Sequence, residues 1–398
     1  MLKIILCSYS YYLNKTHIFK RDTLSTKRLM KEIPFFTLVH QNAILEKQVE
    51  SFYKELHADA WYILGKRVSQ FENDYAIYHS VKHCIGVGNG LDALTLSLRA
   101  LNIGIGDQVI VPANSFIATL LAVTRVGAIP ILVEPDANTF NVTASTILAK
   151  ISSKTKAIIP VHLYGLPCEM GTIVDFAEKN NLYIIEDNAQ AHGATYKNQK
   201  TGSFGIVNAT SFYPVKPLGA YGDGGAITTN DNSLAKQIRL LGNYGSEKKY
   251  YYETTGVNSR LDEIQAGVLS IKLNYLDQWN EERIQLAARY TERLKDIKEI
   301  QTPVCPPDHK HIYHQYVIKA TKRDDLKKYL TKHVIQTGIH YPVPAHLQKA
   351  YEFLNLKKGS LPVTEKLANT VLSLPIYTGM KKEDVEYVSE IISRFYKL

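Results

Sequence analysis

One lysine of the sequence stands where it could act as a nucleophile. Lys216 lies between Pro214 and Pro217, and each proline restricts the backbone beside it. Four glycines follow before the next apolar run, at positions 219, 222, 224 and 225. A lysine in a stiff, glycine-rich loop is poorly explained as a solvated surface charge, and lysine is the side chain that forms Schiff bases with carbonyl groups. The loop therefore indicates a nucleophilic lysine.

A carboxylate is the second candidate group. The apolar residues 182–185 end abruptly in Glu186 and Asp187, with Gln190 and His192 shortly after them. A buried carboxylate at the edge of a sheet needs a cationic partner, although an aspartate at this point could also cap the next helix. Pyridoxal phosphate enzymes combine a lysine, an acid opposite the pyridine nitrogen and a phosphate cradle. Lys216 and Asp187 would supply the first two parts.

The phosphate cradle is predicted in residues 86–94, which read GVGNGLDAL. Glycines followed by a helix expose backbone N–H groups that suit an anion. The dinucleotide site of a nicotinamide-dependent oxidoreductase would instead need a chain-initial βαβ unit, G-x-G-x-x-G spacing and an acid about 20 residues further on. Here the third glycine falls two residues after the second, and Asp107 lies in a predicted turn. The segment is therefore interpreted as a phosphate cradle, and the predicted cofactor is pyridoxal 5'-phosphate.

The elements that must position these groups predict an α/β fold. From about residue 33 to 230, short apolar runs alternate with helix-like segments, a pattern typical of parallel βαβ units. Helices are expected over 91–101 and after Asp231 or Asn232, either of which can cap. Strands are expected over 84–88, 108–113, 129–134, 156–164, 182–187, 209–213 and 226–230. The three candidate segments stand at strand ends, where open α/β sheets bind their ligands.

The C-terminal third predicts a second, smaller α/β domain. Residues 262–297 form a long amphipathic stretch that is interpreted as one long or kinked connecting helix. After a proline-rich break come a strand over 314–320, a helix over 323–333, a strand over 334–341 and a final helix over 382–398. The predicted division is a basic extension over 1–29, a cofactor-binding domain over 30–275, and the connecting helix with the small domain over 276–398.

Composition and charge narrow the function classes. The 398 residues carry a net charge of +9, of which residues 1–29 supply +5. The remaining body has an ordinary charge, which argues against a nucleic-acid partner. No run approaches the roughly 18 apolar residues of a membrane span. The four cysteines lie far apart, so neither a metal site nor a disulfide framework is predicted, and a cytoplasmic location is expected. The aperiodic residues 1–29 are expected to be a disordered, dispensable extension.

Seven segments, in order, resemble one known family. The sequence from about residue 33 to the C-terminus is similar to the DegT/DnrJ/StrS-type aminotransferases, pyridoxal phosphate enzymes of nucleotide-linked deoxysugar biosynthesis. The resemblance implies the aspartate aminotransferase-like (type I) fold, with a large mixed-sheet domain and a smaller C-terminal domain. The segments are WYILGKRVSQFENDYAIY, GVGNGLDAL, VPANSFIAT, VHLYG, EDNAQAHGA, SFYPVKPLGAYGDGGA and GVNSRLDEIQAGVL.

The resemblance assigns roles to individual residues. Lys216 matches the lysine that forms the Schiff base with the cofactor and moves the proton, and Asp187 matches the acid at the pyridinium nitrogen. The other cofactor contacts are Gly90 and Leu91 (phosphate cradle), Ser211 (phosphate hydroxyl ligand), Phe116 (ring stacking), Gln190 (near the ring hydroxyl) and Asn258. Asn258 matches an asparagine that reaches the phosphate of the neighbouring subunit, so the resemblance implies a homodimer.

The sequence departs from the family at four of the positions that surround these residues. Asn188 stands where a small residue is usual, and Val257 replaces an aromatic. Val215 and Pro217 flank the lysine where Gly and Asn are common. None of these changes removes a reacting group.

Several further residues have two readings. His162 and Tyr164 could face the sugar or pack together at the end of a strand. His340, Tyr341 and His346 could border the sugar pocket or shape a turn. The basic, tyrosine-rich residues 243–253 could meet a nucleotide diphosphate or form a solvated face.

The predicted reaction follows from the resemblance. The expected enzyme transfers an amino group from L-glutamate to a dTDP-linked 3-keto-6-deoxyhexose, in a ping-pong reaction that serves O-antigen or surface-glycan biosynthesis. The segment LGAYGDGGA after the lysine resembles C3-directed members. The alternatives are a C4-directed aminotransferase and a non-catalytic regulator that binds the cofactor. Sugar dehydratases of this fold carry His at the lysine position, so Lys216 argues against that activity.

Overall fold

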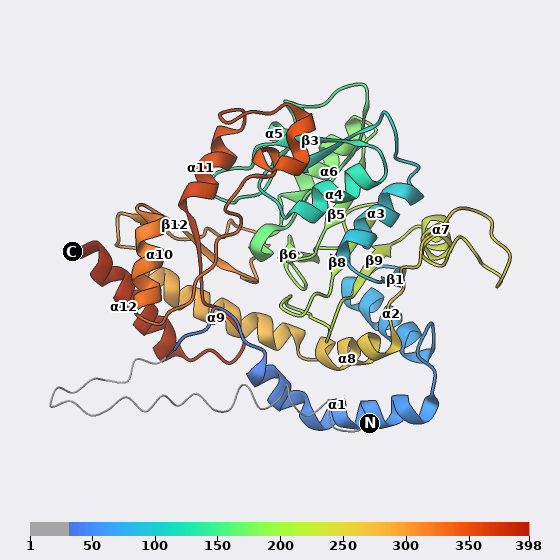
Figure 1. The fold of residues 1–398 in the computed structure, drawn as a ribbon, viewed down its shortest axis with the longest axis horizontal. Helices are drawn as coiled ribbons and strands as arrows, with labels where there is room; N and C mark the ends of the chain where they lie inside the picture. Colours follow the sequence, from blue (N-terminus) through green and yellow to red (C-terminus); the bar gives the residue numbers. More distant parts are fainter. Residues whose placement is uncertain (1–31, 398) are drawn as a thin grey trace, which may run out of the picture. The chain divides into compact units, whose positions relative to one another are not determined.

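The computed structural model describes residues 32–397 and is built around a seven-stranded sheet (Figure 1). The strand order is β1-β9-β8-β5-β4-β2-β3. β9 runs antiparallel to both of its neighbours, whereas the remaining pairs are parallel. The sheet is therefore mixed, as the resemblance implies, and β9 is the strand that departs from the parallel βαβ pattern of the sequence. The strands are β1 His83–Val87, β2 Gln108–Pro112, β3 Ile129–Val133, β4 Thr155–Ile158, β5 Tyr183–Asp187, β8 Val207–Ser211 and β9 Gly225–Thr229.

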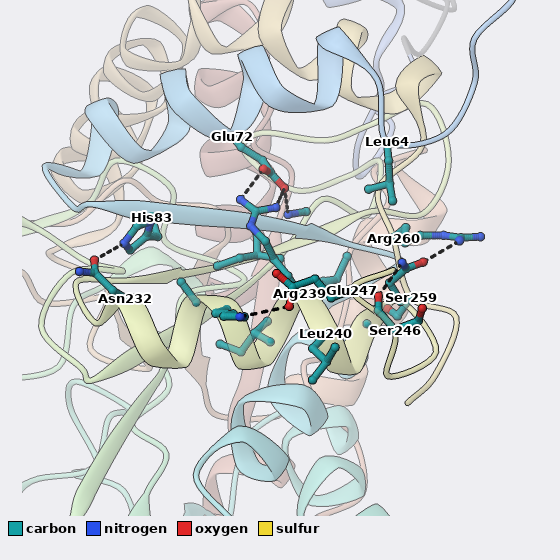
Figure 2. A pocket seen from close by; sticks show the side chains of 18 residues that line it. Leu64, Glu72, His83, Asn232, Arg239, Leu240, Ser246, Glu247, Ser259 and Arg260 are labelled. Atoms are coloured by element: carbon teal, nitrogen blue, oxygen red, sulfur yellow. Dashed lines mark hydrogen bonds and ion pairs between the residues drawn. The ribbon is translucent and has the colours of Figure 1, made fainter. Parts of the chain in front are cut away.

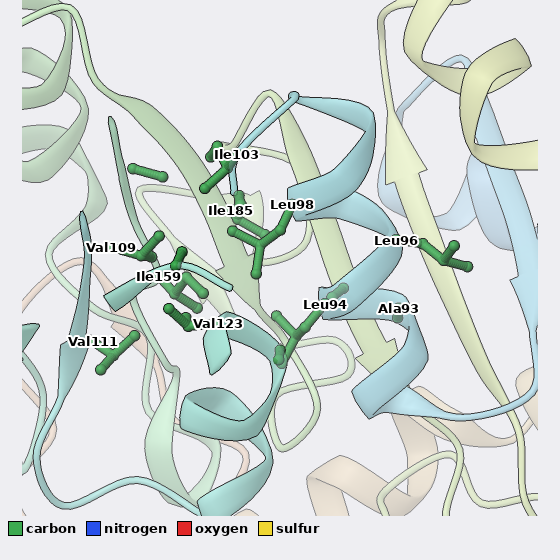
Figure 3. Close-up of a cluster of buried hydrophobic side chains, with 14 of the residues drawn as sticks. Ala93, Leu94, Leu96, Leu98, Ile103, Val109, Val111, Val123, Ile159 and Ile185 are labelled. Carbon is green, nitrogen blue, oxygen red and sulfur yellow. The ribbon is translucent and has the colours of Figure 1, made fainter. Parts of the chain in front are cut away.

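Helices cover both faces of this sheet, which explains why most residues of its strands are buried. Successive residues of β2 illustrate the two faces. Val109 and Val111 belong to the cluster beneath α3 (Gly90–Ala100) and α4 (Ile117–Arg125), where Leu94 and Leu98 of α3 and Val123 of α4 also lie (Figure 3). Ile110 instead joins the cluster beneath α5 (Ala144–Leu148) and α6 (Met170–Lys179). The β1 side of the sheet is packed by α2 (Lys66–His79) and by α7 (Asn232–Gly242).

The predicted cap of α7 is confirmed at Asp231. Its carboxylate accepts hydrogen bonds from the backbone N–H groups of Ser233 (2.7 Å) and Leu234 (2.9 Å). The predicted strand over 156–164 is too long, because β4 ends at Ile158 and residues Leu163–Gly165 form a 3₁₀ turn in which Tyr164 has φ of 60°. Pro160, which has no N–H to donate to a neighbouring strand, lies between the two elements.

The long amphipathic stretch after residue 262 forms two consecutive helices. α8 (Glu263–Leu273) and α9 (Leu276–Leu294) are separated by Asn274 and Tyr275, which agrees with the kinked form of the prediction. The N-terminal helix α1 (Val39–Asp59) packs along α8 (Figure 1). Phe52 of α1 presses against Gly267, where a Cβ atom would lie 2.1 Å from the phenyl ring.

The C-terminal region contains a three-stranded antiparallel sheet, in which β12 (Tyr316–Ala320) lies between β10 (Ile300–Gln301) and β13 (Val371–Leu374). The predicted strand over 334–341 is wrong. That segment makes only isolated bridges, from Ile335 to Ile33 and from Gly338 to Ser373. The third strand is β13, four buried residues that directly follow α11 (Pro362–Thr370). An apolar run this short carries little periodic signal.

Two helices complete the C-terminal region, and a small sheet lies apart from it. The packing helices are α10 (Arg323–Lys332) and α12 (Lys382–Lys397). A second three-stranded sheet consists of β6 (Thr195–Tyr196), β7 (Gln199–Lys200) and β11 (His309–Lys310). The 3₁₀ segments Ala345–Leu347 and Lys349–Leu354 precede α11. The expectation for residues 1–29 lies outside the described residues. Within 32–397, every helix is too short or too polar to cross a membrane.

Glu263 is expected to be a strong determinant of stability. Its carboxylate is fully buried and accepts hydrogen bonds from the backbone N–H groups of Gly65 (2.8 Å), Arg67 (3.0 Å) and Val68 (2.9 Å), which begin α2. Glu263→Ala would leave these donors without a partner, so we expect a loss of about 3 kcal/mol in the free energy of unfolding, measured by urea denaturation. Glu281→Ala, at an exposed position of α9, is the matched control. A loss no larger than that of the control would contradict this prediction.

Candidate functional site

Strand pairing brings the three candidate segments to one edge of the large sheet. Gly225 of β9 pairs with Val87 at the end of β1 and with Ser211 at the end of β8. Asp187, at the end of β5, pairs with Ala209 of β8. The GVGNG segment, the carboxylate and the lysine loop over 212–224 therefore begin side by side.

Lys216 lies half-buried in a loop that hydrogen bonds hold at both ends. Its backbone N–H closes a turn onto the carbonyl of Tyr213 (2.8 Å). The Phe212 N–H donates to Gly224 O, and the Ala220 N–H donates to Phe212 O, each at 2.8 Å. Burial lowers the pKa of Lys216 to about 8, and the negative charge of Asp187 acts in the opposite direction. A substantial fraction of the amine is therefore neutral, and hence nucleophilic, in mildly alkaline solution.

Asp187 is 7% exposed and is held by two donors. Thr119 Oγ1 donates to Oδ2 at 2.9 Å, and the Ala189 N–H donates to Oδ1 at 3.2 Å. Burial raises the pKa of Asp187, and these hydrogen bonds oppose the rise. These two donors thus fix the orientation of the carboxylate, which can still accept a hydrogen bond from a cationic N–H group. Thr119 was not predicted, although it closes the VPANSFIAT segment, because a lone threonine in a helix carries no distinctive signal.

The predicted phosphate residues lie at the start of α3 and at the end of β8. Asn89 caps this helix by accepting a hydrogen bond from the Asp92 N–H (2.8 Å). Gly90 lies so close to β8 that a Cβ atom would come within 2.6 Å of Ser211 Cβ, so only glycine fits there. The start of α3, with the N–H groups of Gly90 and Leu91, therefore lies close to Ser211. Such a helix N-terminus favours a phosphate group.

Aromatic and amide side chains form one wall of the site. Phe116, at 52% exposure, has its ring centroid 5.6 Å from that of Tyr341. Gln190 Nε2 donates to the Tyr341 hydroxyl at 3.3 Å, and Gln190 Oε1 accepts from the Tyr164 N–H at 2.7 Å. The Tyr164 hydroxyl donates to the carbonyl of His340. Five of the predicted residues therefore form one connected group, and the exposed ring of Phe116 is available to a planar ligand.

Two histidines that could have bordered the sugar are instead buried and paired with glutamates. His162 is fully buried. Its Nε2 lies 2.8 Å from Glu186 Oε2, and its Nδ1 accepts from the Cys168 N–H at 3.0 Å. His346 is also buried, and its Nε2 lies 3.0 Å from Glu365 Oε1. Within this chain, both imidazoles are thus buried and paired with a glutamate.

His340 remains beside the site. Its Nδ1 lies 2.8 Å from Ser373 Oγ, and its ring stacks on Phe35 at 5.8 Å between centroids. Burial, followed by the charge of Lys216, lowers the pKa of His340 to about 4. The imidazole is therefore neutral at neutral pH, and the charge of Lys216 contributes to the lowering of its pKa.

Asn258 is exposed and lies next to a different feature of the chain. Asn258 pairs with Asn243. Asn243 and the two residues that follow Asn258, Ser259 and Arg260, line a surface pocket of about 470 Å³ (Figure 2). The pocket lies between β1, α2 and α7, and neither Lys216 nor Asp187 lines it. The nearby Tyr250, Tyr251 and Tyr252 are 64–75% exposed, and Lys248 lies over the Tyr251 ring. Within one chain, Asn258 is thus the predicted cofactor contact that does not join the lysine site.

Comparisons with known proteins agree with this geometry. A model described as the DegT/DnrJ/EryC1/StrS aminotransferase family matches residues 43–393. The dTDP-3-amino-3,6-dideoxy-alpha-D-galactopyranose transaminase of Aneurinibacillus thermoaerophilus is 49% identical, covering 91% of this chain and 99% of the relative. The dTDP-3-amino-3,4,6-trideoxy-alpha-D-glucose transaminase of Streptomyces venezuelae is 42% identical, covering 89% and 93%. A UDP-N-acetyl-3-dehydro-alpha-D-glucosamine 3-aminotransferase of Acidithiobacillus ferrooxidans is 41% identical, covering 91% and 97%.

Solved structures are similar over the same length. The crystal structure of S. venezuelae DesV superposes with a TM-score of 0.91 at 41% identity, covering 92% of this chain and 99% of that one. Bacillus subtilis NtdA, solved with the cofactor PMP, gives a TM-score of 0.85 at 30% identity, covering 94% and 87%. The fold predicted from the sequence is confirmed by these matches.

Proposed function

Because the chain belongs to the DegT/DnrJ/EryC1/StrS aminotransferase family, we propose that it transfers the amino group of L-glutamate to C3 of a dTDP-linked 3-keto-6-deoxyhexose. The chain is a pyridoxal phosphate-dependent sugar aminotransferase. The position of the amino group, the nucleotide and the donor belong to the proposal. The observation that carries it is the 49% identity to a transaminase named for a dTDP-linked 3-amino-3,6-dideoxyhexose.

The described residues fit this cofactor at each of its polar ends. We assign the phosphate to Gly90, Leu91 and Ser211, where the absent Cβ of Gly90 allows the start of α3 to approach Ser211. The ring nitrogen is assigned to Asp187, the ring face to Phe116 and the ring hydroxyl to the neighbourhood of Gln190. When bound, pyridoxal phosphate supplies an electron sink that stabilises negative charge on the carbon next to the transferred nitrogen.

The residues of this chain then perform two tasks. Asp187, oriented by Thr119 and the Ala189 N–H, keeps a proton on the ring nitrogen and so maintains the withdrawal of electrons. Lys216 Nζ, whose pKa burial lowers to about 8, accepts a proton from the donor carbon and returns it to the cofactor carbon. The second half-reaction runs the same steps in reverse on the keto sugar.

The loop after the lysine supports the C3 assignment. Residues 218–226 read LGAYGDGGA, and Leu218 and Ala220 are fully buried, so the loop has a fixed shape. Its bulk would determine how the hexose lies over the cofactor. A shift of about one ring carbon decides which carbonyl comes within the roughly 3–3.5 Å needed for attack.

Product analysis tests this proposal. We expect the enzyme, supplied with L-glutamate, to convert a dTDP-linked 3-keto-6-deoxyhexose into a product whose proton NMR spectrum places nitrogen at C3, with release of 2-oxoglutarate. The 4-keto isomer and the UDP-linked analogue of the sugar are run in parallel. Nitrogen at C4, with the 3-keto sugar left unchanged, would overturn the regiochemical assignment. Preferred use of the UDP-linked sugar would overturn the assignment of dTDP as the nucleotide.

We further propose that the enzyme works as a homodimer with two shared sites. Two features support this proposal: Asn258 is exposed and pairs with Asn243 rather than with a residue of the lysine site, and Phe116, Tyr213 and Val215 leave exposed apolar surface around the lysine loop. A second copy that presents Asn258 to this surface would cover it and complete the phosphate site.

A further inference from the structure

A second lysine, Lys272, is buried next to the loop that carries Lys216. It lies on α8 and is 1% exposed. Its Nζ donates to the carbonyl oxygen of Gly219 at 2.7 Å and lies 4.3 Å from the centroid of the Tyr221 ring. Both partners belong to the glycine-rich segment that follows Lys216. The ammonium group is thus enclosed by the lysine loop.

This buried charge is poorly explained by stability alone. Burial lowers the pKa of Lys272 to about 8. Within residues 32–397, no carboxylate lies within ion-pair distance of its Nζ. A methionine would fill a similar volume without the desolvation penalty. The hydrogen bond to Gly219 and the contact with Tyr221 therefore indicate what the charge does: it attracts a carbonyl dipole and an aromatic face.

The segment over 217–224, which Lys272 contacts, packs against the turn that contains Lys216. Gly219 lies against the backbone of Pro214, since a Cβ atom at position 219 would come within 2.2 Å of Pro214 O. Pro214 is two residues before Lys216, in the turn that the Lys216 N–H closes. From the same face of α8, Gln265 Oε1 accepts from the Tyr221 N–H at 2.8 Å. A displacement of Gly219 would thus move the backbone of the turn that carries the Lys216 side chain.

We propose that Lys272 is a positioning residue for Lys216, holding the loop over 217–224 so that Lys216 Nζ meets the cofactor. The inference rests on the proposed role of Lys216. It assigns no contact between Lys272 and the cofactor or the substrate. A small displacement is sufficient, because a misplacement of about 1 Å can cost on the order of 100-fold in rate.

The test measures how fast cofactor-free protein captures pyridoxal phosphate at Lys216, with borohydride quenching and peptide mapping by mass spectrometry. This measurement needs neither donor nor sugar, so it can be interpreted even if the proposed substrates are wrong. We expect Lys272→Met to slow capture at least about tenfold, and Lys272→Arg, which keeps a charged donor, to stay closer to the wild type. Deuterium exchange of residues 217–224 should rise in Lys272→Met.

Val388→Ala is the stability control, because Val388 is fully buried in α12 and belongs to the small C-terminal core. With glutamate, the Lys272→Met holoenzyme should lose kcat with little change in KM. If Lys272→Met does not fold, Lys272→Gln is measured and interpreted in the same way. Capture and exchange equal to the wild type would overturn the proposal, as would an equal slowing by Val388→Ala. Capture at a lysine other than 216 would overturn both this proposal and the assigned role of Lys216.

Discussion

Lys216→Ala is expected to lower turnover by at least about four decades, because the variant loses both the covalent attachment point and the group that moves the proton. The cofactor should still bind noncovalently, since Gly90, Ser211 and Asp187 do not depend on the lysine side chain. Turnover is measured by release of 2-oxoglutarate, and retention of the cofactor by equilibrium dialysis. Lys154→Ala, at an exposed position outside the site, is the matched control and should behave as the wild type.

Borohydride reduction identifies the attachment point directly. Wild-type protein treated with pyridoxal phosphate and borohydride should yield one modified peptide, which contains residue 216. Modification of another lysine, or substantial turnover by Lys216→Ala, would show that the assignment is wrong.

Mixing two inactive variants should restore activity. If each site combines Lys216 of one chain with Asn258 of the other, a heterodimer of Lys216→Ala and Asn258→Ala chains has one intact site and one doubly altered site. Equal mixing with random exchange makes half of the dimers mixed, so we expect about a quarter of wild-type activity per chain. The activity is assayed after refolding the chains together.

Each variant refolded alone is the control for this mixing experiment. Sedimentation should show dimers in all samples. A mixture no more active than the sum of its parts would contradict the shared site, and a fully active monomer would contradict the dimer itself.

The sequence was most informative where function depends on local order along the chain. Asp187 ends an apolar run, Gly90 lies in a glycine pattern before a helix, and Lys216 lies between two prolines, so each group could be placed at the end of a strand. Strand pairing through Gly225 then brings two of these segments together. The role of such residues is visible because the backbone geometry they need restricts the amino acids beside them.

Contacts between distant segments were not predictable in the same way. Thr119 and Lys272 lie on helices, where threonine and lysine are common, and only the fold shows that they reach Asp187 and Gly219. For His162 the sequence left a sugar contact and packing against Tyr164 both open, and the fold shows that the chain turns there and directs its ring to Glu186. β13 escaped prediction because tertiary packing, more than sequence pattern, determines so short a strand.

The antiparallel orientation of β9 has a consequence for engineering this enzyme. A parallel β9 would require the chain to cross the sheet after Lys216, and such crossovers take a dozen or more residues. Instead the lysine segment is a hairpin that returns to the edge it left, and its far end, Gly225, lies against Asn89, where a Cβ atom would come within 2.6 Å of the Asn89 carbonyl. The hairpin therefore packs against the start of α3, to which we assign the phosphate. If the proposed assignments hold, we expect insertions between residues 217 and 223 to weaken cofactor binding as well as to change the sugar site, so substrate range is better altered at Tyr341 and Phe116.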